Sequence, residues 1–297
     1  MTTVENTLPT RSSKGTSVAD IMSTPVFAVS ARDNLARARK LMLINGVSRL
    51  AVVDDGRLEG VVTRKDLGMR LNQSEPQWRR RPLDQIPVNL IMTADPVTIS
   101  PDEPIQDAAK TMLDRDISGL FVLDERDGRL GIVTKHDLVK YFTMVGCPLR
   151  VGDMMSGPPP IVSRLHTLNS VIDIMSEQGV DRVVVRDADN EKVCSGIITL
   201  DDLGFVEINP RGLENVKESR REWHAGKKRL RKVVRLPAVA EDVMATPLIS
   251  VERSTMAEDA AKTMVENNFD MLPVINGELA GQLNFEDILR WLTEAPE

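Results

Sequence analysis

The heptapeptide "GVVTRKD" at residues 60–66 decides the fold, because three further versions of it occur along the chain. They read "GIVTKHD" at 131–137, "GIITLDD" at 196–202 and "GQLNFED" at 281–287. In each version an apolar run follows a glycine, and a Thr or Asn is followed three positions later by an Asp. An apolar run that ends in a capping residue predicts a strand that leads directly into a helix.

A second segment precedes each heptapeptide. The four leading segments read "VADIMSTPV" from Val18, "VNLIMTADPV" from Val88, "VGDMMSGPPPIV" from Val151 and "AEDVMATPLISV" from Ala240. Each leading segment contains a Met (Met22, Met92, Met155 and Met244). The number of residues from this Met to the Thr or Asn of the following heptapeptide is nearly constant. Such regular self-similarity predicts four copies of one structural unit.

The second copy shows the order of elements within the unit. The β-branched stretch "PVTIS" predicts a strand, and a helix follows in which Ser100 caps, Pro101 lies in the first turn and Glu103 completes a capping box. The strands "GLFVLD" and "LGIVT" are joined by a hairpin turn at Asp127 and Gly128, and a second helix begins at "KHDLVKYF". The helical apolar face is formed by Ile105, Ala108, Ala109 and Met112.

The other copies follow the same order. Hairpin turns are predicted at Asp55-Gly56 and Asn276-Gly277, whereas the third copy has the longer turn "DADNEK". The matching helix faces are Leu35, Ala38, Leu41 and Met42 in the first copy, and Met256, Ala260, Met264 and Val265 in the fourth. The predicted unit is therefore strand, helix, strand, strand, helix.

This unit resembles the cystathionine-β-synthase (CBS) domain, whose copies pair into Bateman modules. The resemblance implies an α/β (α+β) fold in which the first two repeats form one module and the last two form the other. The expected boundaries are a disordered tail at 1–16, repeats at 17–70, 86–145, 150–206 and 239–294, and a basic linker at 207–238.

The Thr-x-x-Asp motif has two readings. As a structural feature it is a helix-capping box. As a ligand site it exploits the unpaired N–H groups and the partial positive charge of a helix N-terminus, which suit a phosphate. In the family that the repeats resemble, the Asp binds ribose and the Ser or Thr binds phosphate. The resemblance thus implies ligand contacts from Thr63 with Asp66, Thr134 with Asp137, Thr199 with Asp202, and Asp287 in the fourth motif.

The four candidate sites differ in charge. Arg64, Lys65, Lys135 and His136 could attract phosphates to the first two motifs, whereas the third and fourth motifs carry acidic neighbours. The fourth also departs from the usual pattern at Gln282 and Asn284. Two arginines stand before the core strands of their repeats, where a guanidinium could reach a phosphate or remain a solvated or salt-bridged group: Arg49 and Arg182.

These features favour a non-catalytic regulatory protein, such as an energy sensor, that binds AMP, ADP, ATP or S-adenosylmethionine between paired repeats and requires no cofactor. Magnesium would accompany ATP, and the residues suggest no other metal site. An unidentified protein partner and a homodimer are compatible with this reading. The alternative is an interaction scaffold with vestigial clefts that contacts nucleic acid through the basic segment 215–237. An enzyme is disfavoured, because the repeats use nearly the whole chain.

Composition bounds the remaining possibilities. The 297 residues are 41% hydrophobic and 28% charged, as in folded globular proteins, and the net charge is −6. No apolar run reaches the roughly 18 residues of a membrane span, so we expect a cytoplasmic protein. The two cysteines show no metal-binding or disulfide spacing.

Overall fold

The computed structural model describes residues 15–71, 82–124, 126, 128–187, 193–200, 203, 215–216, 235–236 and 238–294. Residues 1–14 of the predicted tail and most of the basic linker lie outside these residues, whereas Thr16 accepts a hydrogen bond from the Ile105 N–H. Within the linker, β11 (Asn215–Val216) and β12 (Arg235–Leu236) pair in antiparallel fashion. Across the described ranges, the chain has no helix that is both long enough and apolar enough to cross a bilayer.

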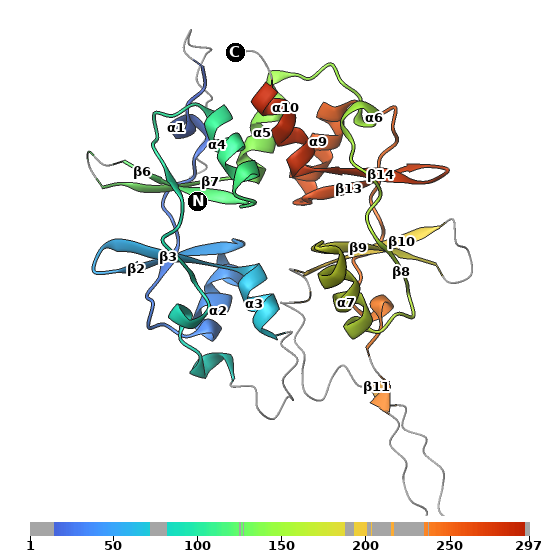
Figure 1. The fold of residues 1–297 in the computed structure, drawn as a ribbon, viewed down its shortest axis with the longest axis horizontal. Coiled ribbons are helices and arrows are strands. Elements are labelled where there is room, and N and C mark those ends of the chain that lie inside the picture. The colour runs from blue at the N-terminus through green and yellow to red at the C-terminus, as the bar shows by residue number, and fades with distance from the viewer. Residues whose placement is uncertain are drawn as a thin grey trace, which may run out of the picture.

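Four similar units occupy the four corners of the molecule in Figure 1. The first repeat consists of β1 (Ala28–Val29), α2 (Leu35–Asn45), β2 (Arg49–Asp54), β3 (Arg57–Thr63) and α3 (Arg64–Leu71). The second consists of β5 (Thr98–Ile99), α4 (Ile105–Asp114), β6 (Gly119–Leu123), β7 (Leu130–Thr134) and α5 (Lys135–Val145). The third has β8 (Ile161–Ser163), α7 (Leu168–Gln178), β9 (Arg182–Arg186) and β10 (Cys194–Thr199). The fourth has α9 (Ala257–Asn267), β13 (Met271–Asn276), β14 (Glu278–Asn284) and α10 (Phe285–Glu294).

Each repeat is built on one antiparallel hairpin. The pairs β2–β3, β6–β7, β9–β10 and β13–β14 form these hairpins, and β1, β5 and β8 add a parallel strand to the first three. Asp55 and Gly56 have positive φ, as do Gly128 and Gly277, in keeping with the tight turns that the sequence predicts. Asp127 and residues 188–192 of the third turn lie outside the described residues.

The start of the second repeat's first helix differs from the prediction. Helix α4 begins at Ile105 with Pro104 as its N-cap, so the predicted cap at Ser100 is wrong. Instead, the Ser100 N–H donates to the Glu103 carboxylate and closes a separate turn before the helix. The carbonyls of Pro101 and Glu103 in this turn accept hydrogen bonds from Ala19 and Val18 of the first leading segment.

The leading segments cross between paired repeats. They contain α1 (Val18–Ile21), η3 (Val88–Leu90), α6 (Val151–Met154) and η4 (Ala240–Asp242), with η2 (Leu83–Gln85) just before η3. The first segment lies on the second repeat, and the second lies on the first, where β4 (Thr93–Ala94) pairs with β3. The third and fourth repeats exchange their segments in the same way. This exchange defines a first module of repeats one and two and a second module of repeats three and four.

The glycine that opens each heptapeptide makes this crossing possible. A Cβ at Gly60 would lie 2.8 Å from the carbonyl oxygen of Thr93, and a Cβ at Gly281 would lie 2.5 Å from that of Ser156. Such distances are too short for a side chain, so only glycine lets the partner's segment lie flat against the strand. The glycine therefore marks a point of close backbone approach at positions 60, 196 and 281, whereas at Gly131 the nearest atoms belong to the Met22 side chain.

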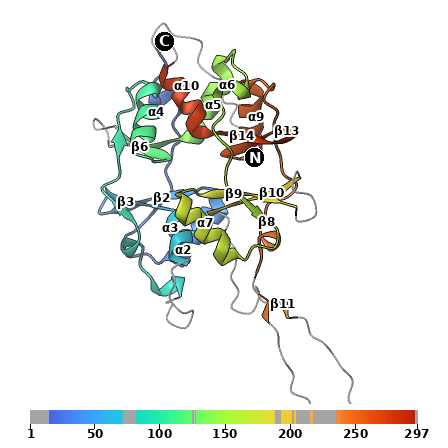
Figure 2. The ribbon, with the colours of Figure 1, turned by 45° about the vertical axis from the view of Figure 1, so that its right-hand side comes forward.

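The two modules join through the second and fourth repeats. Helices α4 and α5 pack against α9 and α10, as Figure 1 and Figure 2 show. Most residues of the predicted apolar faces, including Met112 and Met264, are buried in one core that these two repeats share, whereas Met256 is the N-cap of α9 and is half-buried. Phe142 and Trp291 meet edge to face in it, with ring centroids 5.1 Å apart. The first and third repeats have separate cores.

The mixed helix and sheet architecture and the pairing into two modules confirm the fold class predicted from the sequence.

Candidate functional site

The hairpins place equivalent residues at the heart of each repeat. The motif Thr or Asn at the end of the hairpin's second strand lies opposite the first residue of the other strand: Thr63 with Arg49, Thr134 with Gly119, Thr199 with Arg182, and Asn284 with Met271. The first residue of each motif helix donates its backbone N–H to the residue before that strand: Arg64 to Ser48, Lys135 to Ser118, Leu200 to Asp181, and Phe285 to Asp270. Residues at one of these positions can thus be compared across repeats.

The first two motifs form matching capping boxes. The Thr63 N–H and hydroxyl both donate to Oδ2 of Asp66, at 2.8 and 2.7 Å. The Thr134 N–H and hydroxyl donate to Oδ2 of Asp137 at 2.9 and 2.7 Å. Both boxes use a single carboxylate oxygen, and both carboxylates are half-buried. In each case Oδ1 lies outside the box, as a ribose-binding role would require.

The fourth motif uses its carboxylate differently. Oδ2 of Asp287 accepts the Asn284 N–H, while Oδ1 accepts the Ser156 hydroxyl at 2.5 Å and pairs with Arg290 at 2.7 Å. The Asp287 side chain is only 1% exposed. Burial raises the pKa of Asp287 above its ordinary value, although the hydrogen bonds from Ser156 and Asn284 and the charge of Arg290 oppose this. The predicted ligand contact from Asp287 is therefore already committed to protein groups.

The third motif is described only in part. Thr199 ends β10 opposite Arg182, and the Leu200 N–H donates to the Asp181 carbonyl. Asp202, the predicted ribose ligand of this motif, lies outside the described residues.

Arg49 reaches from the first repeat to the second. Its Nη2 donates to the Ser118 hydroxyl at 2.8 Å. A Cβ at Gly119 would lie 2.1 Å from Nη1 of Arg49, so the guanidinium occupies the space that a side chain at position 119 would fill. The first module therefore holds an arginine that spans its two repeats and contacts the Ser118 hydroxyl.

Arg182 makes the equivalent reach in the second module, but it meets carboxylates. Its Nε donates to Asp181 at 2.7 Å, and its Nη1 lies 3.0 Å from Asp270, the counterpart of Ser118. Burial alone would lower the pKa of Arg182, yet these two carboxylates outweigh it and raise the pKa. At Asp270, the effect of burial is larger than that of the Arg182 charge, so the pKa of Asp270 is raised. At Asp181, burial is outweighed by the hydrogen bond and charge of Arg182, so the pKa of Asp181 is lowered. The positive charge of Arg182 is thus balanced within the protein.

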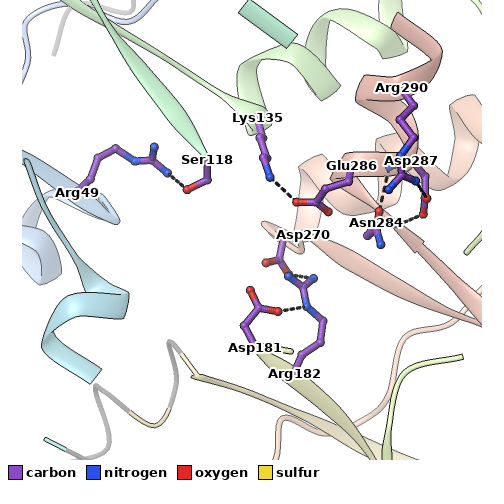
Figure 3. A network of polar contacts seen from close by, with 10 residues as sticks. All are labelled: Arg49, Ser118, Lys135, Asp181, Arg182, Asp270, Asn284, Glu286, Asp287 and Arg290. Atoms are coloured by element: carbon purple, nitrogen blue, oxygen red, sulfur yellow. Dashed lines mark hydrogen bonds and ion pairs between the residues drawn. The ribbon is translucent and has the colours of Figure 1, made fainter. Parts of the chain in front are cut away.

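The motif helices of the second and fourth repeats meet at the junction of the modules. Figure 3 shows Lys135 of α5 pointing to Glu286 of α10, with which it forms an ion pair. The neighbouring residues His136 and Phe285 meet in an edge-to-face contact with ring centroids 6.3 Å apart. Lys135 is therefore held by the opposite module. Lys65 stays exposed on α3, where its charge helps to lower the pKa of Asp181.

Sequence reasoning missed the partners of the predicted cations. Ser118 and Asp270 occupy equivalent positions before the core strands, and Glu286 occupies the position of His136. Aligning these positions would have revealed a neutral group in one module and acidic groups in the other. Their contacts, however, depend on how the repeats face one another. Among the described residues, no group of three or more His, Cys, Asp or Glu is arranged to hold a metal ion.

Comparison with known proteins identifies relatives of this architecture. A CBS domain-containing protein of Dictyostelium discoideum is 36% identical over 129 residues, which cover 41% of this chain and 88% of that protein. An inosine-5'-monophosphate dehydrogenase of Korarchaeum cryptofilum is 33% identical over 159 residues, but these cover 50% of this chain and only 30% of the enzyme. The crystal structure of protein MJ1225 from Methanocaldococcus jannaschii aligns with a TM-score of 0.74 at 20% identity, over 93% of this chain and 99% of that one.

The CBS domain family model matches residues 18–70, 88–143, 151–203 and 239–294, which together make up most of the chain. Four matched copies, each with the hairpin and the crossing segment described above, establish that this chain belongs to the CBS domain family.

Proposed function

We propose that this protein is a non-catalytic regulatory protein whose first module binds an adenosine-containing ligand that carries phosphate, such as AMP, ADP or ATP. Relatives of the chain include both a protein named only for its CBS domains and an enzyme in which the matched region is a minor part. That distribution is compatible with a regulatory role. The role as an energy sensor and the cytoplasmic location both remain predictions from the sequence.

The use of the motif carboxylates carries this proposal. In the first module the capping boxes of Asp66 and Asp137 end on Oδ2, so Oδ1 can accept hydrogen bonds from ribose hydroxyls. In the fourth repeat both oxygens of Asp287 are used by protein donors. A ligand there would have to displace buried hydrogen bonds, which costs free energy.

The arginines support the same choice of module and favour phosphate over the cationic S-adenosylmethionine. Arg49 reaches across its module to Ser118, whereas Arg182 is balanced by the carboxylates of Asp181 and Asp270. An anionic group near Arg182 would be repelled by these carboxylates, so phosphate binding is favoured in the first module.

The test is calorimetric titration of nucleotide-stripped protein with AMP, ADP, ATP with magnesium, and S-adenosylmethionine. We expect saturable binding of a phosphate-bearing ligand and a loss of about tenfold to a hundredfold in affinity in Asp66→Ala or Asp137→Ala, because a hydrogen bond to a charged group contributes about 1.5–3 kcal/mol. Absence of binding across the panel would leave the motifs as helix caps and refute the proposal.

A matched control separates ligand binding from capping. Asp20 accepts the N–H and hydroxyl of Ser17 through Oδ2 at 2.8 and 2.9 Å, the same box geometry at α1 rather than at a motif helix. Asp20→Ala should lose a similar capping contribution of about 1 kcal/mol without changing ligand affinity. Equal losses of affinity in Asp20→Ala and Asp66→Ala would assign the effect to stability alone.

A further inference from the structure

Lys135 is a nearly buried cation of the first module whose carboxylate partner lies in the second module. It is the first residue of α5, directly after the Thr134 cap, and its side chain is 8% exposed. The residue therefore belongs to the N-terminus of α5, where a phosphate would be expected to bind. The Glu286 carboxylate of the other module holds this ammonium group, as Figure 3 shows.

The surroundings of this ion pair contain balanced charge. The negative charge of Glu286 helps to raise the pKa of both Arg182 and Asp270. Asp270 and Asp181 form ion pairs with Arg182. The Glu286 side chain is 31% exposed, so ions from solvent can reach this region. A phosphate that arrived here would meet a lysine already neutralised by a carboxylate.

We propose that Glu286 is an internal competitor for the phosphate of the ligand at the second repeat. In this view, the carboxylate and the phosphate bind the same ammonium group of Lys135 in turn, and the first must leave before the second can bind. Glu286 thereby sets the affinity for anionic ligands. The inference rests on the proposed function, since it names a specificity-determining residue of the same site.

The competition also links the ligand to the junction of the modules. Glu286 lies in the first turn of α10, next to Phe285, which contacts His136. Releasing Glu286 from Lys135 removes a polar contact between the modules. A ligand can shift an equilibrium only through a difference in its affinity for two arrangements, and exchange at Lys135 supplies such a difference.

The test compares AMP with adenosine, which lacks the phosphate, by calorimetric titration of the parent protein and Glu286→Gln. We expect Glu286→Gln to bind AMP about tenfold more tightly, equivalent to about 1.4 kcal/mol, and to bind adenosine as the parent does. In a Lys135→Met background, Glu286→Gln should no longer increase AMP affinity. Glu266→Gln, which changes an exposed carboxylate of α9, controls for a general loss of negative charge.

The outcomes separate the two proposals. If the parent binds AMP and Glu286→Gln binds it equally well, Glu286 does not compete and only the inference is overturned. The same holds if the gain persists with Lys135→Met or appears in Glu266→Gln, because the effect would then be one of overall charge. If no protein in the set binds AMP, and the parent binds neither ADP nor ATP, the proposed function and the inference are both overturned.

Discussion

Replacing Gly281 by Ala should destabilise the second module, because the crossing segment leaves no space for a methyl group. The new Cβ would lie 2.5 Å from the Ser156 carbonyl oxygen, where real contacts are at least 3.0 Å. The obstacle is backbone, and it cannot rotate away as a side chain can. The crossing segment therefore has to move by several tenths of an ångström.

The magnitude follows from the bonds at this crossing. Ser156 and Gln282 exchange two backbone hydrogen bonds, at 2.9 and 3.1 Å, and the displacement weakens both. Each contributes about 1 kcal/mol, and overpacking typically costs about 1–3 kcal/mol. We expect Gly281→Ala to lower the free energy of unfolding by about 3 kcal/mol, which corresponds to a fall of about 6–12 °C in Tm for a unit of this size.

Gly131→Ala provides the matched comparison. A Cβ at Gly131 would lie 2.7 Å from Sδ of Met22, the flexible part of a side chain, and the nearest other atom is 3.3 Å away. Because Met22 can adopt another rotamer, this variant should lose no more than about 1 kcal/mol. The reduced entropy of the unfolded chain affects both variants alike.

The assay is thermal unfolding followed by calorimetry, with urea unfolding as a second measure of the free energy. Equal losses in the two variants would show that the Ser156 carbonyl is not the cause of the effect. An unchanged Tm in Gly281→Ala would refute the close backbone approach itself.

Two further variants test the electrostatic features of the sites. Ser118→Asp gives Arg49 a carboxylate partner like the one that Arg182 has in Asp270. AMP should then bind about tenfold more weakly, while the affinity for adenosine should not change. Equal weakening of both ligands in titrations would contradict a phosphate-binding role for Arg49. Burial raises the pKa of Asp287 in the folded state, so ionising this carboxyl group costs stability. The free energy of unfolding should therefore decrease as the pH rises from about 4, the ordinary pKa of Asp, through the raised pKa of Asp287. Asp287→Asn should remove this part of the pH dependence in urea unfolding measured over a pH series, and identical curves for the two proteins would count against the assigned pKa.

Local patterns were sufficient to predict the repeated unit. The alternation of strands and helices, the turns at Asp55-Gly56 and Asn276-Gly277, and the buried faces of α2, α4 and α9 depend on residues close in sequence. The cap of α4 was predicted wrongly, because it depends on a contact with a segment that is distant in the sequence. Ser100 and Glu103 have the spacing of a capping box, but the turn that they form receives the leading segment of another repeat.

The candidate site was only partly predictable, because its contacts are between repeats. The charges at Lys135 and Glu286 were visible in the sequence and were interpreted as preferences for a ligand. Their pairing depends on the packing of α5 against α10, which brings together residues that are far apart in the chain. The commitment of Asp287 likewise depends on Ser156, which arrives from the third repeat's leading segment.

The exchange of leading segments separates the order of the chain from its division in space. Val18 is the first residue that the family model matches in the first repeat, yet its N–H donates to the Glu103 carbonyl of the second repeat. Cutting the chain between those two repeats would leave each fragment without the segment that covers its own repeat, because that segment belongs to the other fragment. For truncation, domain transplantation or gene fusion, the smallest piece that retains its own leading segments is a pair, and an engineered break belongs between the modules.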